Sequence, residues 1–324
     1  NQLNPNLARL NNWWTNIYGH IAKCNDFLVQ LENVKNKAVM TESQQERCEQ
    51  MEAECRFIRA LNYFCLVNMF GEYPILTEAD KQKMGVPLWT ELATTISGTN
   101  KARATQGEVY DLIISDLETS VPFLEGDGII KDEKPRVNEW AVKSLLAKAY
   151  IFTLQFSKAQ PLLKDIIDNS GKRLVSYYLL RNMFNGNNEF NEESIWEVNY
   201  TTDLQGTSGI NITGHRYNNY PAITYLKDGK ETINGFANFF VHDRNIPRYG
   251  FDDTTTVFQD RPDYIQKSLQ VRQDKSADPR IWVDMLQPYV DSVDLGTGEK
   301  YPIIKGRMEG YPSRNQKGWN NRKY

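Results

Sequence analysis

Flat aromatic side chains set among amide and charged residues are the part of this sequence that could do chemistry. The composition recurs in three segments: "NNWWTNIY" at 11–18, "TGHRYNNYPAITY" at 213–225 and "GWNNRKY" at 318–324. Trp and Tyr rings stack on the apolar C–H faces of sugars, whose hydroxyls need amide and charged partners. We therefore expect a ligand site of this chemistry, with stacking residues Trp13, Tyr217, Tyr220 and Trp319 and hydrogen-bond donors Arg216 and Asn218.

The sequence carries no recognisable catalytic or metal-binding motif. Its three histidines form no HExxH or Cys/His cluster, and it has no Gly-x-Ser-x-Gly elbow, phosphate-binding loop or EF-hand loop. We therefore expect no catalytic residues, no metal site and no cofactor. A glycoside hydrolase needs only two carboxylates, and 41 Asp and Glu are available, so that enzyme class stays open.

Charge and hydropathy narrow the range of partners. Among 324 residues, 38 Lys and Arg stand against 41 Asp and Glu, so no net field draws the chain to nucleic acid or an anionic membrane. No apolar run is long enough to cross a bilayer, and the first residues lack the basic and apolar regions of a signal peptide. We expect a globular protein that is truncated at both ends.

Apolar residues recur at helical spacing in the first part of the chain. One helix is predicted from a single apolar face formed by Trp14, Ile17, Ile21, Cys24, Leu28 and Leu31. A second helix begins at one of two overlapping capping boxes, Thr41 with Gln44 or Ser43 with Glu46, and Gly71 and Pro74 end it. Its predicted apolar face consists of Met51, Cys55, Ile58, Leu61 and Cys65.

Three more helices are predicted from their start signals, which are Thr105 with Glu108, Asn138, and Ser157 with Gln160. The first of them stops near Pro122. The last two make a hairpin that matches the offsets of a tetratricopeptide repeat at Leu146, Ala147, Tyr150, Ala159 and Leu163. Ala60 and Tyr63 repeat the same Ala-x-x-Tyr step, and residues 78–102 are interpreted as an insertion between helical hairpins.

The texture of the sequence changes after about residue 175. The alternation in "SIWEVNY" at 194–200 predicts a short strand, and a helix is expected around Arg280 to Leu286. The remainder of 201–324 is rich in Gly, Asn, Asp, Pro and Tyr, and long loop-rich regions of globular proteins usually carry function.

The predicted fold is mostly α, with tetratricopeptide-like helical hairpins, a loop-rich α/loop ligand-binding region and few short strands. We expect a single domain at 1–324, made of a helical scaffold at 1–175 and a ligand-facing region at 176–324. Trp14, Trp140 and Trp196 are expected in the core. The four cysteines are interpreted as small buried hydrophobes, with a Cys24–Cys48 disulfide as the alternative.

Six segments, taken in order, resemble the SusD/RagB family of outer-membrane nutrient-binding lipoproteins. They are "W-x-x-I-Y-x-x-I-x-x-C-N" at 14–25, "AECRFIRALNYFCLVNMFGEYPIL" at 53–76, "RATQGEVYDLIISDL" at 103–117, the hairpin at 140–168, "NEESIWEVNY" at 191–200 and "GWNNRKY" at 318–324. The resemblance implies a protein that captures an oligosaccharide or polysaccharide without cleaving it. It also implies delivery to a SusC-like TonB-dependent transporter, and a lipid anchor, absent from this chain, that holds the protein at the surface of the outer membrane.

Three alternatives remain open. Some members of this family capture peptides, and peptide binding would use backbone hydrogen bonds and mixed pockets in place of flat rings. A glycoside hydrolase with a helical core would need two suitably spaced carboxylates. A cytosolic tetratricopeptide scaffold would fit the first half of the sequence better than the loop-rich second half.

Overall fold

The structure is a computed structural model that describes residues 8–72, 74–92, 100–124, 135–182, 188–198, 223–234, 245–251, 261–287, 289–294, 298–306 and 320–321. It divides into two compact units, one of Asn1–Leu174 with Glu192–Val198 and one of Val175–Asn191 with Asn199–Tyr324. The predicted class, mostly α with few short strands, is confirmed. The organisation as a single domain and the tetratricopeptide-like detail stay predictions.

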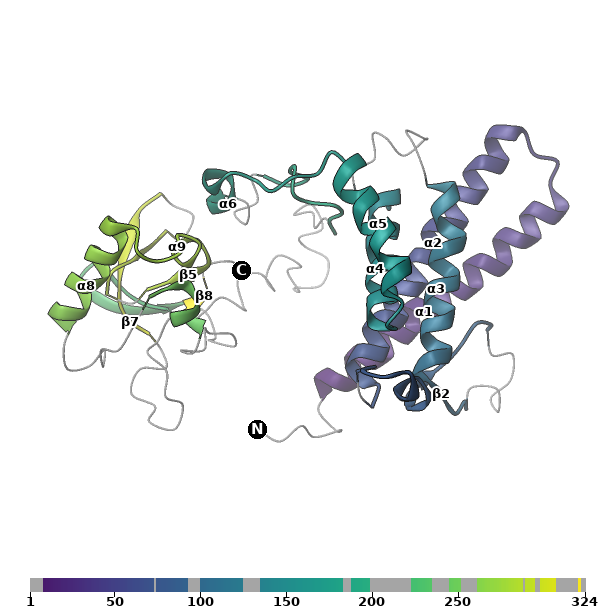
Figure 1. Cartoon of the computed structure of the whole chain (residues 1–324), viewed down its shortest axis with the longest axis horizontal. Coiled ribbons are helices and arrows are strands. Elements are labelled where there is room, and N and C mark those ends of the chain that lie inside the picture. Colours follow the sequence, from purple (N-terminus) through teal and green to yellow (C-terminus); the bar gives the residue numbers. More distant parts are fainter. Residues whose placement is uncertain are drawn as a thin grey trace. The chain divides into compact units, whose positions relative to one another are not determined.

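The first unit is built on five α-helices: α1 (Ala8–Lys37), α2 (Glu42–Phe70), α3 (Gln106–Ser120), α4 (Glu139–Phe152) and α5 (Phe156–Asn169). Helices α1 and α2 form a long antiparallel hairpin, α3 packs on α2, and α4 pairs with α5 (Figure 1). Between α2 and α3 lie the 3-10 helix η1 (Glu78–Gln82) and the antiparallel strands β1 (Met84–Pro87) and β2 (Arg103–Thr105). The 3-10 helix η3 (Val121–Phe123), which contains Pro122, follows α3.

Most of the predicted helix starts are confirmed by side-chain caps. Thr41 Oγ1 accepts a hydrogen bond from the Gln44 N–H at 3.3 Å and Thr105 Oγ1 accepts one from the Glu108 N–H at 3.2 Å, each within a complete capping box. Asn138 Oδ1 caps α4 by accepting from the Ala141 N–H at 2.9 Å. Because α2 already begins at Glu42, Ser43 lies inside the helix and is not its cap.

The predicted cap of α5 is wrong. The helix begins at Phe156, upstream of Ser157, and its N-cap Gln155 makes no side-chain cap bond. The reason is the tight connection from α4, in which Leu154 has a positive φ of 63° and the Gln155 N–H donates to the Tyr150 carbonyl at 2.8 Å. This turn carries the chain directly into helical geometry two residues before the predicted start.

The predicted apolar face of α2 is also wrong. The residues that the helix buries are Ala53, Phe57, Arg59, Ala60, Tyr63, Phe64, Leu66 and Val67, whereas Cys65 is exposed. Apolar residues surround almost the whole second half of this helix, so spacing could not decide the face. The neighbours decide it, because α1, α3, α4 and β1 all contact α2.

The first unit has one continuous core that includes residues of all five helices. Trp14 and Trp196 pack against it, and the Trp196 ring meets Phe57 edge-on at 5.3 Å between centroids. Trp140 is half-buried, with Lys143 Nζ 4.9 Å from its ring centroid.

The strand predicted in "SIWEVNY" is absent over its described residues, 194–198. Side chains hold this segment instead of a strand ladder. The Trp196 indole N–H donates to the Pro135 carbonyl at 3.1 Å, and Asn138 Nδ2 donates to the Ile195 carbonyl at 3.1 Å.

The expectation that all four cysteines are buried is wrong. Only Cys24 is buried, Cys48 and Cys55 are half-buried, Cys65 is exposed, and all four thiols are free, so there is no Cys24–Cys48 disulfide. Cys65 lies on α2 outside the face that its neighbouring helices cover, which is why burial does not reach it.

The second unit contains an antiparallel sheet that the sequence did not predict. Its strand order is β4 (Lys230–Asn234), β3 (Ile223–Lys227), β7 (Lys300–Gly306) and β6 (Ser292–Asp294). A two-residue turn joins β3 to β4, and its residues Asp228 and Gly229 have φ of 50° and 75°, the left-handed values that tight hairpins need. Tyr225, expected in a polar loop, is 4% exposed, and its ring packs on that of Tyr301 with 5.4 Å between the ring centroids.

The other elements described in the second unit are helices and one further pair of strands. They are α6 (Tyr177–Asn182), η5 (Pro247–Tyr249), α8 (Arg261–Asp274), α9 (Ile281–Asp284) and the paired strands β5 (Met285–Leu286) and β8 (Asn320–Asn321). The helix expected around Arg280 to Leu286 is therefore shorter than predicted, because the chain becomes extended at Met285 to pair with β8.

Candidate functional site

A pocket of about 470 Å³ lies in the first unit, between the N-terminal half of α1 and the segments that follow β1 and precede β2. Its walls combine three aromatic side chains, Trp14, Tyr18 and Trp89, with polar groups of Thr15, Asn25, Glu91, Asn100 and Lys101. A volume of this size is within the range of small-molecule sites, which also combine apolar walls with a few polar groups. The pocket is therefore the candidate ligand site of this unit.

Hydrogen bonds from α1 and α2 hold the wall that carries Trp89. The Tyr18 hydroxyl donates to the Pro87 carbonyl at 2.7 Å, and Asn25 Nδ2 donates to the Trp89 carbonyl at 3.0 Å. The Tyr63 hydroxyl donates to the same carbonyl at 2.7 Å and accepts from the Trp89 N–H at 2.6 Å. All these hydrogen bonds involve main-chain atoms of Pro87 and Trp89. They position the Trp89 indole without using its own N–H group.

Burial keeps these hydroxyls protonated. It raises the pKa of Tyr63 to about 12 and also raises the pKa of Tyr18, where the nearby Tyr63 acts in the same direction. Both groups therefore stay hydrogen-bond donors over the whole physiological pH range.

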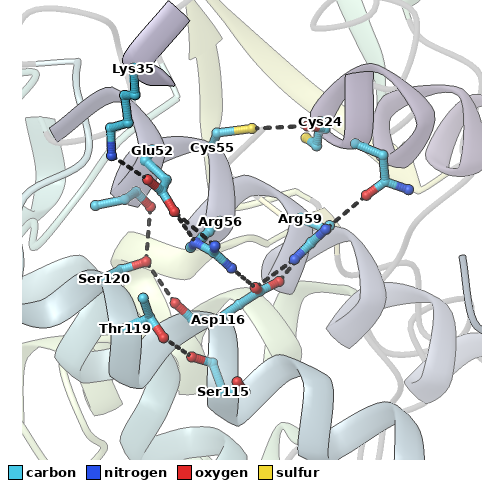
Figure 2. Close-up of polar contacts among 12 residues, drawn as sticks. Cys24, Lys35, Glu52, Cys55, Arg56, Arg59, Ser115, Asp116, Thr119 and Ser120 are labelled. Atoms are coloured by element: carbon cyan, nitrogen blue, oxygen red, sulfur yellow. Dashed lines mark hydrogen bonds and ion pairs between the residues drawn. The ribbon is translucent and has the colours of Figure 1, made fainter. Parts of the chain in front are cut away.

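Asn25 connects this wall to a buried ion pair of Arg59 and Asp116, which Figure 2 shows. Arg59 donates to Asp116 through Nε at 2.8 Å and Nη2 at 2.7 Å, and through Nη1 to Asn25 Oδ1 at 2.8 Å. Arg59 is 6% exposed, and Asp116 and Asn25 are each 1% exposed. Because the Asn25 amide is held from behind, its Nδ2 is fixed toward Trp89, so the core of three helices sets the position of one pocket wall.

The exposed side of Trp89 has a cationic neighbour. Lys101 Nζ lies 5.3 Å from the centroid of the indole ring, within cation–π range. A flat ring beside an ammonium group, with the carboxylate of Glu91 and the amide of Asn100 in the same pocket, offers stacking and hydrogen bonding together.

The part of the structure that is described does not place the predicted ligand residues in one site. Trp13 lies on α1 with 52% of its surface exposed, but it does not line this pocket, whereas Trp14, expected in the core, does. Arg216, Tyr217, Asn218 and Tyr220 and also Trp319 lie outside the residues that the structure describes. These six residues therefore stay a prediction.

Sequence reasoning missed Tyr18 and Trp89 as members of one site. Tyr18 stands in the aromatic "NNWWTNIY" segment, which was singled out, so its composition could have pointed to it. Trp89 lies 71 residues beyond Tyr18, in a segment interpreted only as an insertion. No motif or spacing in the sequence links these two residues.

The described residues show neither a metal-binding cluster nor a membrane-spanning helix. They contain no group of three or more His, Cys, Asp and Glu side chains that could hold a metal ion. In the same part of the chain, every helix is too short or too polar to cross a bilayer.

Comparison with known proteins shows which family the first half of the chain resembles. The family model SusD-like_3, described as "Starch-binding associating with outer membrane", matches residues 1–151. SusD-like protein P25 of Formosa agariphila is 28% identical over 194 residues, which is 60% of this chain and 32% of that protein. These matches support the predicted assignment to the SusD/RagB family.

A SusD-like protein of Bacteroides ovatus matches over a similar length, with 24% identity over 193 residues, which is 56% of this chain and 31% of that protein. The matched part of this SusD-like chain thus spans about a third of the length of its curated relatives.

Solved structures share the fold over almost the whole chain. A laminarin-binding SusD-like protein has a TM-score of 0.65 at 22% identity and covers 96% of this chain and 58% of its own. A SusD-like protein of Bacteroides fragilis has a TM-score of 0.68 at 17% identity and covers 97% of this chain and 57% of its own. At these identities the likeness establishes the SusD-like fold and leaves the ligand open.

Proposed function

We propose that this chain belongs to a non-catalytic glycan-binding protein that captures oligosaccharide or polysaccharide at the cell surface. The likeness to the SusD/RagB family supports a carbohydrate-binding role in nutrient capture. One SusD-like structural neighbour is described as laminarin-binding, which adds a glycan to test first. The protein would form a single SusD-like domain, with its loop-rich part at 176–324 contributing Arg216, Tyr217, Asn218, Tyr220 and Trp319 to the ligand face.

The same family likeness supports a partner and a location. The captured glycan would pass to a SusC-like TonB-dependent transporter, and a lipid anchor would hold the protein on the outer membrane. No cofactor is needed, because capture and release require only binding energy.

The observation that carries the proposal is the aromatic pocket. Trp14, Tyr18 and Trp89 supply rings, and Asn100, Glu91 and Lys101 supply polar edges, in a volume of about 470 Å³. Aliphatic ligands would not need this combination, whereas a sugar presents an apolar face and hydroxyls at once.

The test is a binding screen of the purified chain against polysaccharides, laminarin among them, and mixed peptides, by affinity gel retardation and calorimetry. The informative variant is Trp89→Ala, because the bonds to Tyr63 and Asn25 reach the Trp89 backbone and survive the change. We expect it to weaken glycan binding about tenfold or more, the equivalent of about 1.4 kcal/mol of stacking. Trp13→Ala, Tyr217→Ala and Tyr220→Ala test the predicted ligand residues in the same assay.

Trp140→Ala is the matched control, since Trp140 is half-buried in the same unit and does not line the pocket. It should bind as the parent chain does. Binding of peptides alone would favour the peptide-capturing alternative. Shortened glycan in the reaction products would contradict capture without cleavage and point to the hydrolase.

A further inference from the structure

Two thiols from different helices meet in the interface between α1 and α2. The Cys55 thiol donates to the carbonyl oxygen of Cys24 across 3.5 Å, and its sulfur points toward α1 (Figure 2). Cys24 is 7% exposed and Cys55 is half-buried. Both residues also line a second pocket of about 500 Å³, so a small reagent has a route to them.

Polar bonds on both sides of the two cysteines hold α1 against α2. Next to Cys24, Asn25 Oδ1 accepts from Arg59, one turn of α2 beyond Cys55, at 2.8 Å. On the other side, Lys35 Nζ donates to Glu52 at 2.7 Å. Because α1 and α2 cannot slide past each other without breaking one of these bonds, Cys24 and Cys55 are kept next to each other.

The surroundings also shift the pKa values of the two thiols in opposite directions. A side-chain interaction between the two thiols, separate from the bond to the carbonyl, lowers the pKa of the Cys24 thiol, and the nearby guanidinium of Arg59 acts in the same direction against burial. The same thiol–thiol interaction and burial raise the pKa of Cys55. Such a pair has one sulfur favoured as thiolate and a protonated sulfur beside it, the arrangement of a dithiol that reacts stepwise.

We propose that Cys24 and Cys55 are a disulfide-forming pair that links α1 to α2 covalently when the chain meets a low-molecular-weight disulfide oxidant. The Cys24 thiolate attacks one sulfur of the oxidant, breaks its S–S bond and releases the first thiolate, which takes up a proton. Cys55 then gives its proton to solvent, and its sulfur attacks Cys24 Sγ and releases the second thiol. Two protein thiols are oxidised by two electrons, and one external disulfide is reduced to two thiols.

The remaining cysteines provide the background for the experiment. Cys48 lies beside the sulfur of Met40 at 3.7 Å, and Cys65 is exposed on α2. The chain with Cys48→Ser and Cys65→Ser therefore keeps only the proposed pair and removes competing bridges, both within and between molecules. It is incubated with oxidised glutathione, blocked with an alkylating reagent, and analysed by intact mass and peptide mapping.

We expect loss of two hydrogen atoms from the intact mass, protection of both thiols from alkylation, and a linked peptide containing Cys24 and Cys55. A rise in thermal midpoint that dithiothreitol reverses should accompany the bridge, since it closes a loop in the unfolded chain. Adding Cys55→Ser should leave a stable glutathione adduct on Cys24. If both thiols instead stay open to alkylation, or if the adduct persists with Cys55 present, the proposal is wrong. Peptide mapping of the parent chain provides a second readout that does not depend on the serine variants.

Discussion

Asp116 lies at the centre of a polar network that joins three helices. Its carboxylate receives two hydrogen bonds from Arg59 and a third from Arg56 Nη1 at 3.1 Å. Arg56 in turn donates to Glu52, which also pairs with Lys35 of α1 (Figure 2). Charged groups this deep are costly to bury unless every partner is present, so the network specifies one arrangement of α1, α2 and α3.

Replacing Asp116 with Asn should therefore be strongly destabilising. The change keeps the shape of the side chain but leaves the buried guanidinium of Arg59 without its counter-ion, and we expect a loss of about 3 kcal/mol in the free energy of unfolding. Denaturant unfolding followed by circular dichroism measures it. Asp111→Asn, on the exposed side of the same helix, is the control and should stay within about 0.5 kcal/mol. Equal effects of the two changes would contradict a structural role for the ion pair.

At the scale of the element, the end of α2 decides how the chain reaches the pocket wall. The helix ends at Phe70, and Gly71 caps it in an extended conformation with φ of −66°. Glycine is required here for space, because a Cβ at this position would lie 2.4 Å from the Val67 carbonyl oxygen. The sharp exit directs the chain through η1 into β1 and then to Trp89.

Two glycine substitutions should have opposite effects. Gly71→Ala forces the Cβ against a backbone oxygen that cannot move without disturbing the last turn of α2, and we expect a loss of about 1–3 kcal/mol. Gly19→Ala, inside α1 with nothing within 4 Å of the added Cβ, should gain about 0.5–1 kcal/mol from helix propensity. Thermal unfolding of both variants measures the signs. A neutral Gly71→Ala would show that the helix end relaxes at little cost.

At the scale of the whole molecule, the two units have unequal cores among the described residues. The core of the first unit runs through all five helices, from Ile21 on α1 to Ala159 on α5. In the second unit the described cluster comprises Ile246, Phe251, Ala277, Ile281 and Met285, beside a four-stranded sheet. Among the described residues, the smaller cluster buries less apolar surface and so offsets less of the entropy of ordering its chain.

We therefore expect residues 1–198, which contain the whole first unit, to fold alone, and residues 199–324, which contain most of the second unit, to lack a stable fold of their own. The first fragment should retain helical circular dichroism and a cooperative thermal transition, while the second should lack a transition of its own. Calorimetry of both fragments and of the full chain provides the comparison. Two separate transitions in the full chain, matching those of the two fragments, would contradict the single domain that we propose for 1–324.

The sequence by itself determined those features that depend on neighbours along the chain. The capping box at Thr105, the cap at Asn138 and the end of α2 at Gly71 involve atoms within a few residues of each other, so composition and spacing were sufficient to predict them. At the start of α2 they left Thr41 and Ser43 as alternatives, and the structure selects Thr41. The ordered set of family segments likewise predicted the SusD-like fold. The start of α5 was missed because it depends on the geometry of the turn before it, which residue types alone do not reveal.

Only the tertiary structure decided which distant residues meet. The buried face of α2, the pairing of β3 with β7, the pocket that joins Tyr18 to Trp89 and the meeting of Cys24 with Cys55 each link segments separated by tens of residues. Helical or alternating spacing shows that a residue has an apolar side, but not what will cover it. That choice is made when whole elements pack, because the favourable arrangement is the one that buries surface and satisfies every buried polar group together.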